Sequence, residues 1–144
     1  MRRIAFLLVL LLAPAGICSN MSLRSDVMRM LNHMYAQGYQ AFLVRYLQLD
    51  LLQPCTLAVP PLSTADDYVL MAMGGNRTLD IRLTMTDDTS KLVDTLPDDM
   101  PVFRLDPSTV LEARLIVVEA LDMTHGARSD SAVVMWLLRP VDRE

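Results

Sequence analysis

Apolar residues near the start of the chain repeat with the period of a helix. The repeat has the spacing i, i+3, i+4, i+7 and i+8 and consists of Val27, Met30, Leu31, Met34 and Tyr35. This spacing is typical of an amphipathic helix with one buried stripe. Ser22 or Ser25 can cap the N-terminus of such a helix, and Gly38 suits the position after its C-terminus. We therefore predict one short helix over about residues 24–37.

From Tyr39 onwards the pattern changes to short apolar runs separated by clusters of Pro, Gly, Asp and Ser, which is typical of strands and turns. In the clearest run, 79–86, apolar residues alternate with polar ones, so we predict that Leu79, Ile81, Leu83 and Met85 face a core and the other side faces water. Further strands are expected at 39–47, 56–59, 68–73, 102–105, 112–120 and 132–138. About seven short strands pack best as two antiparallel sheets. We predict a mainly β fold, an antiparallel β-sandwich preceded by the helix.

The first fifteen residues have the three parts of a secretory signal peptide. Arg2 and Arg3 precede the apolar run 4–12, which leads into Ala13-Pro14-Ala15. The run is shorter than the roughly 20 apolar residues that span a bilayer. We predict cleavage after Ala15, a secreted or periplasmic protein, and no stable membrane anchor after cleavage. The rest then divides into an N-terminal segment, 16–38, and a sandwich domain, 39–144.

The charge of the exported chain argues against nucleic-acid binding. Of the 13 basic residues, Arg2 and Arg3 leave with the signal peptide, so eleven remain against 17 acidic ones, a formal charge of −6. A chain of this charge is repelled by phosphate backbones. The 144 residues are enough for one domain with a core.

The two cysteines leave two possibilities open. An oxidising compartment allows a disulfide between Cys18 and Cys55. If the signal peptide is instead cleaved after Ser19, Cys18 is removed and Cys55 becomes a small buried apolar residue. Asn20 and Asn76 begin Asn-x-Ser/Thr triplets, which have a meaning only in a host that glycosylates its proteins.

The order of the pieces in the middle of the chain resembles the bacterial pre-peptidase C-terminal (PPC) domain family. The resemblance rests on the strands 68–73 and 79–83, the segment Leu92-Val93-Asp94-Thr95 and the run 98–105, and it spans about residues 39–140. It implies a jelly-roll-like β-sandwich on an exported bacterial protein, often attached to proteases but not catalytic itself. This chain would be a stand-alone member. Arg82 and the lack of glycine after Thr86 depart from the family pattern and put a cation site in doubt.

Paired aspartates are the most visible polar feature, at 66–67, 87–88 and 98–99. Calcium takes six to eight oxygen ligands. The candidate calcium ligands are Asp80, Asp87, Asp88, Asp98 and Asp99. Aspartate is also a common turn residue, because its carboxylate accepts hydrogen bonds from nearby backbone N–H groups, and no EF-hand spacing is present. We favour solvated turns over a calcium site and expect no other cofactor.

No catalytic signature is present, so we assign no catalytic residues. His33 and His125 lie far apart in the sequence, no Gly-x-Ser-x-Gly elbow occurs, and Cys55 lacks the motif of a nucleophile. Trp136 lies in an apolar run, which favours a place in the core over a sugar-stacking role. We expect a non-enzymatic binding or accessory module that contacts another protein. The alternatives are a calcium-dependent carbohydrate-binding or ligand-binding domain and a small secreted hydrolase.

Overall fold

The part of the protein that the structure describes consists of one helix, eight strands and their connections. The computed structural model describes residues 21–63, 65–86, 91–93, 98–105 and 115–141. The elements are α1 (Met21–Ala36), β1 (Gln40–Asp50), β2 (Cys55–Ala58), β3 (Asp66–Gly74), β4 (Thr78–Thr86), β5 (Lys91–Val93), β6 (Val102–Leu105), β7 (Leu115–Met123) and β8 (Ser129–Pro140).

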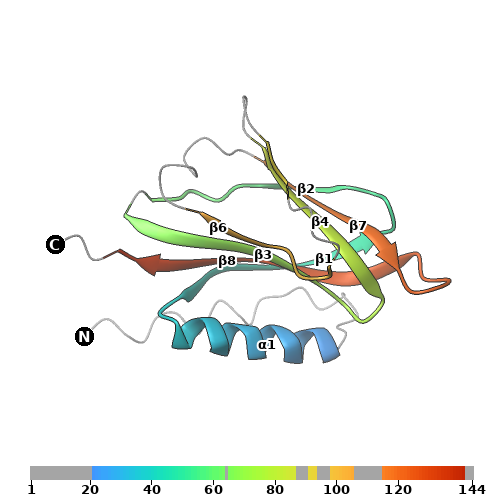
Figure 1. Ribbon diagram of the computed structural model, residues 1–144, viewed down its shortest axis with the longest axis horizontal. Helices are drawn as coiled ribbons and strands as arrows, with labels where there is room; N and C mark the ends of the chain where they lie inside the picture. The colour runs from blue at the N-terminus through green and yellow to red at the C-terminus, as the bar shows by residue number, and fades with distance from the viewer. Residues whose placement is uncertain (1–20, 64, 87–90, 94–97, 106–114, 142–144) are drawn as a thin grey trace.

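The strands form two antiparallel four-stranded sheets. Sheet A has the order β1-β8-β3-β6, and sheet B has the order β2-β7-β4-β5. The two sheets stack as a sandwich, and α1 covers the outer face of sheet A (Figure 1). The predicted mainly β fold with a preceding helix is therefore confirmed. The short strand β5 was not among the strands that the pattern predicts.

The main core lies between the sheets. Trp136 of β8 is buried there, and its ring meets that of Tyr68 edge-on, with centroids 6.4 Å apart. Leu49, Ile81 and Leu83 are also fully buried in this core. The predicted core position of Trp136 is thus confirmed, and burial of a ring of this size stabilises the sandwich by about 2–3 kcal/mol.

A second core lies between sheet A and α1. Val69, Met71 and Met135 point from sheet A toward the helix and are buried against its residues Leu23 and Val27. The central strands β3 and β8 are therefore covered on both faces. For this reason residues 68–73 read as a continuous apolar run, without the polar alternation of a half-exposed strand.

The predicted helix is correct in kind but not in every boundary. It begins at Met21, three residues earlier than expected, so Leu23 belongs to the helix and is buried against sheet A. Tyr35 is 72% exposed, so its place in the buried stripe was wrong. Successive helical residues are rotated by about 100°, and Tyr35 therefore turns away from the sheet when Met34 faces it. Gly38, with φ of 87°, then turns the chain into β1.

Strand β4 departs from regular alternation at its start. Its register with β7 shifts on both sides of Asp80, which marks a β-bulge. Ile81, Leu83 and Met85 are buried as predicted, but Leu79 is 50% exposed and Thr78 is buried instead. Thr84, expected on the wet face, is also buried. The paired residues Asp66 and Asp67, expected in a turn, begin strand β3.

Candidate functional site

Three connections meet at one end of the sandwich, on the right in Figure 1. They are the β1–β2 connection, the β3–β4 turn and the β7–β8 hairpin. The backbone N–H of Thr124 donates to the carbonyl of Arg77 at 2.8 Å, and that of Leu51 donates to the carbonyl of Arg128 at 2.8 Å. These bonds hold the three connections side by side. We call residues 51–53, 75–79 and 124–128 the hairpin end.

A buried carboxylate organises the hairpin end. Oδ2 of Asp130 accepts hydrogen bonds from the backbone N–H of Arg77 (2.8 Å), the backbone N–H of Thr78 (2.9 Å) and the hydroxyl of Thr78 (2.9 Å). Its Oδ1 accepts one from the backbone N–H of Ser131 at 2.9 Å. A buried charge is stable only with such partners. Asp130 therefore acts as an anchor for the β3–β4 turn.

The β3–β4 turn closes tightly over this carboxylate. A Cβ atom on Gly75 would lie 2.5 Å from Oδ1 of Asp130, closer than atoms can approach. Glycine at position 75 is thus required by the carboxylate below it. Sequence reasoning missed Asp130 because it lies 52 residues from Thr78. The Gly-Gly-Asn turn signals a close approach of some group, but no local pattern names the group.

At this end, irregular backbone leaves the side chains of two leucines exposed to solvent. Leu79 is exposed because the bulge in β4 turns Thr78 inward. Leu52 is 62% exposed and has φ of 60°, which is the left-handed region. The N–H of Leu52 donates to the carbonyl of Ala120 at 2.9 Å, and Ala120 pairs with Ile81 of β4. The two leucines therefore flank the end of β7, one on each side.

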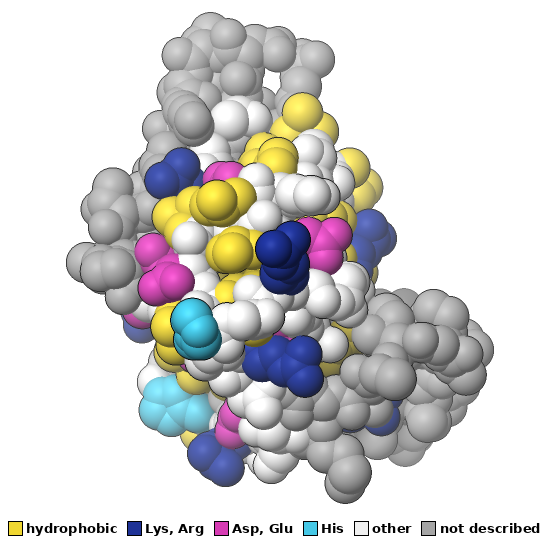
Figure 2. Space-filling view, turned by 90° about the vertical axis from the view of Figure 1, so that its right-hand side faces the viewer, with side chains coloured by type: hydrophobic (Ala, Val, Ile, Leu, Met, Phe, Trp, Pro, Cys, Tyr) yellow, Lys and Arg dark blue, Asp and Glu magenta, His cyan; other side chains and the backbone are white. Residues whose placement is uncertain are grey.

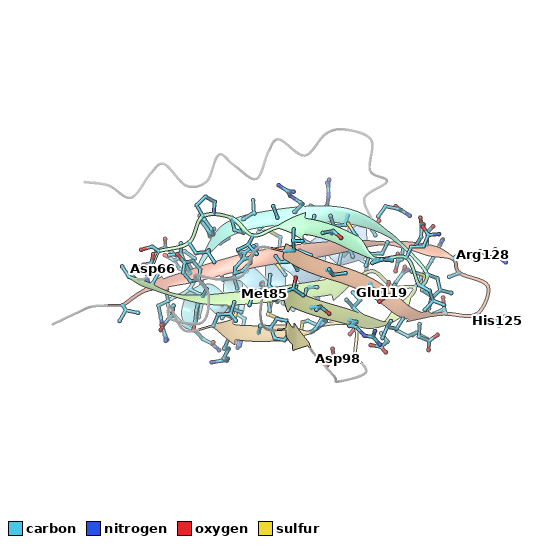
Figure 3. The ribbon with its side chains drawn as sticks, turned by 90° about the horizontal axis from the view of Figure 1, so that it is seen from above. Asp66, Met85, Asp98, Glu119, His125 and Arg128 are labelled. Carbon is cyan, nitrogen blue, oxygen red and sulfur yellow. The ribbon has the colours of Figure 1, made fainter. Side chains whose placement is uncertain are left out.

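Charged side chains of both signs surround these leucines. Asp50, Arg77, Asp122 and Arg128 are exposed around the same connections. Figure 2 views the molecule from this end and shows apolar side chains over its upper part, interrupted by basic and acidic ones. His125 and Arg128 lie at the tip of the β7–β8 hairpin (Figure 3). This end of the sandwich therefore exposes apolar and charged side chains together.

The candidate calcium ligands are brought together only in part. The segment before β6 crosses from sheet B to sheet A, since the N–H of Ile81 donates to the carbonyl of Asp98 (2.8 Å) and that of Gly74 to the carbonyl of Asp99 (2.9 Å). Asp98 thus lies beside the start of β4, where Asp80 pairs with Asp122. Asp98 points out at the sandwich edge (Figure 3).

The geometry at Asp98 is that of a turn residue. Its Oδ1 accepts a hydrogen bond from the backbone N–H of Met100 at 3.1 Å, as aspartates in turns commonly do. Asp87 and Asp88 lie outside the described residues. Within the residues that the structure describes, no three His, Cys, Asp or Glu side chains are arranged to hold a metal ion.

The other candidate groups are spread over the molecule. His33 and His125 are both exposed, and Nε2 of His33 lies 2.9 Å from Nε2 of Gln37. Cys55 is half-buried, and its thiol is bonded to no other cysteine in the described part of the chain; Cys18 lies outside the described residues.

Asp67 serves a structural ion pair. Its Oδ2 accepts a hydrogen bond from Nη2 of Arg139 at 3.1 Å, and the guanidinium lies 4.8 Å from the centre of the Tyr39 ring. This hydrogen bond raises the pKa of Arg139 above its ordinary value. The cluster links the ends of β3 and β8 to the start of β1.

Comparison with known proteins does not place the chain in a family. No protein-family model and no curated protein matches the chain. The helical structure in the described part of the chain does not combine the length and the apolarity that a membrane crossing needs.

Proposed function

We propose that the protein is an exported, non-enzymatic binding or accessory module, and that it contacts another protein through the hairpin end. The proposal combines the signal-peptide pattern of residues 1–15, which lie outside the described residues, with the surface described above. The single observation that carries the protein contact is the exposure of Leu52 and Leu79 at one end of the sandwich.

The exposure of these leucines costs free energy. A left-handed conformation costs an L-residue about 1–2 kcal/mol, and Leu52 adopts it while leaving its side chain in water. The bulge in β4 places Leu79 outside the core, whereas the regular alternation of a strand would bury its side chain. Strained backbone is a reason to look for function at the site. Because each side chain is already about half buried, its complete burial by a partner would contribute about 1 kcal/mol.

The resemblance to the PPC family supports the same kind of role. Of the segments that carry it, 68–73 lies on β3, 79–83 lies on β4, and 98–105 covers β6 and the stretch before it. Asp94 and Thr95 lie outside the described residues. We propose a stand-alone PPC-like domain in the periplasm or outside the cell, with no catalytic residues and no resident cofactor.

The proposal is tested by comparing partner capture between matched variants. A tagged protein is exported from its host, chemically crosslinked in place, purified and analysed by quantitative mass spectrometry. The test variant carries Leu52→Ser and Leu79→Ser. The control variant carries Met28→Ser and Tyr35→Ser, which removes two apolar side chains of comparable exposure from the outer surface of α1.

The expected result is a protein that is recovered with the wild type and with the α1 control but falls at least tenfold with the hairpin-end variant. Thermal unfolding of each variant shows whether the fold is kept. Equal recovery of every crosslinked protein from both variants would show that the hairpin end is not the contact surface.

A further inference from the structure

Strand β1 is the one long edge strand in the described part of the protein. The edge strands β2, β5 and β6 have only four, three and four residues, whereas β1 has eleven. In the described residues β1 pairs only with β8. Alternate backbone N–H and C=O groups of β1 therefore point away from the sheet. Such an edge can pair with a strand of another molecule.

All but one of the side chains in the first part of β1 favour pairing with another strand. The run from Ala41 to Leu47 contains six apolar residues and a single charge, Arg45. Apolar runs of this length with high strand propensity and no proline readily associate as strands. Arg45 is exposed in the middle of the run.

Arg45 lies on the side of β1 that faces sheet B. Leu43 and Leu47 pack in the core between the sheets, whereas Val44 and Tyr46 pack toward α1. Side chains alternate along a strand, so Arg45 shares the inter-sheet side with the two leucines. An inward-pointing charge on an edge strand is a recognised obstacle to edge-to-edge association.

The alternation also determines what Arg45 would meet in a second copy. If two β1 strands pair antiparallel in one continuous sheet, opposed side chains lie on the same face. Arg45 then faces Arg45 of the other copy, or Leu43, Leu47 or Leu49 in neighbouring registers. The first arrangement opposes like charges, and the others place a charge against apolar side chains. Asp50, the acidic residue of β1, lies on the opposite face and cannot pair with Arg45 in these registers.

A bulge limits pairing at the other end of the strand. The register between β1 and β8 shifts between Ala41 and Leu43, which bends the strand and interrupts its regular edge. The bulge and Arg45 together leave only residues 46–49 of β1 as a regular edge without a charged side chain. This half leads into Leu51, which forms a bridge to Ala120 of sheet B.

We propose that Arg45 prevents the β1 edge from pairing with a second copy of this chain. The test compares the wild type with Arg45→Val by sedimentation velocity over a range of protein concentrations. We expect the wild type to stay monomeric and Arg45→Val to self-associate at least ten times more strongly. Arg104→Val is the matched control, because Arg104 is an exposed arginine on the short edge strand β6.

Two further variants keep the test decisive. Arg45→Glu keeps a charged side chain at position 45, now negative, and should remain monomeric. If the valine variant folds poorly, Arg45→Thr removes the charge in its place, because threonine also has a high strand propensity. In the associated variants, hydrogen exchange should slow at amides of β1. The proposal is overturned if the uncharged variants stay monomeric, if Arg104→Val associates equally, or if the wild type itself pairs through β1.

Discussion

Asp130 and Thr78 are joined by two hydrogen bonds of 2.9 Å, although 52 residues separate them. One bond comes from the backbone N–H of Thr78 and the other from its hydroxyl. The bonds draw Thr78 into the protein and leave Leu79 in water at the bulge. The carboxylate that stabilises the β3–β4 turn is therefore connected with the exposed leucine of the hairpin end.

We expect Asp130→Asn to lower the free energy of unfolding by about 2–4 kcal/mol, because an amide presents donors to N–H groups that need an acceptor. Urea unfolding measures the change. Asp122→Asn is the control, since Asp122 is an exposed aspartate on the neighbouring strand β7. Equal stability of the two variants would show that the buried carboxylate is not needed.

Substitutions at Leu52 should separate backbone strain from side-chain effects. Glycine adopts the left-handed region freely but loses more entropy on folding, so Leu52→Gly should leave the unfolding free energy unchanged or raise it by up to about 1 kcal/mol. A β-branched residue tolerates this conformation poorly, so Leu52→Val should lower it by about 1 kcal/mol. Denaturant unfolding gives the order. A valine variant more stable than the glycine variant would contradict the strain at this position.

Ionisation of Tyr46 should lower the free energy of unfolding at alkaline pH. Its phenol packs between β1 and α1, and burial raises its pKa above 10.0, an effect that the nearby Arg24 reduces. A raised pKa means that the fold favours the neutral phenol. Its contribution is present below pH 10 and is lost as the pH rises through the raised value.

Thermal unfolding between about pH 9 and pH 11 measures this loss. Tyr46→Phe cannot ionise, so its melting temperature should fall less over this range than that of the wild type. The control is Tyr35→Phe, which removes an exposed phenol from α1. If Tyr46→Phe follows the wild-type curve throughout, ionisation of Tyr46 does not contribute.

Calcium should have no effect on thermal unfolding, because Asp98 binds the backbone of its own turn and the described residues offer no group of three ligands. The measurement compares melting temperatures in excess calcium and in chelator, since an ion that binds the native state raises the melting temperature. A concentration-dependent rise would favour the calcium-dependent alternative. Alanine substitution of Asp87 and Asp88 would then show whether that pair supplies the ligands.

The helix and most strands could be predicted from the sequence because their signals are local. The spacing of Val27 and Met34 marks a helical stripe, and the alternation from Ile81 to Met85 marks a strand, whatever these elements later pack against. The turns also carry their own chemistry, as at Gly38. The sequence by itself therefore determined the mainly β class, the preceding helix and the core position of Trp136.

Only the tertiary structure decided which faces are covered and which groups meet. Residues 68–73 are buried on both faces because α1 covers the outer face of sheet A. Thr78 is buried and Leu79 is exposed because Thr78 forms hydrogen bonds with Asp130, which lies 52 residues away in the sequence. Period and propensity describe neighbours along the chain, but the bulge, the buried carboxylate and the position of β1 at the edge of sheet A, as the described residues show it, depend on contacts between distant residues. The hairpin end could be recognised only once those contacts had placed its three connections together.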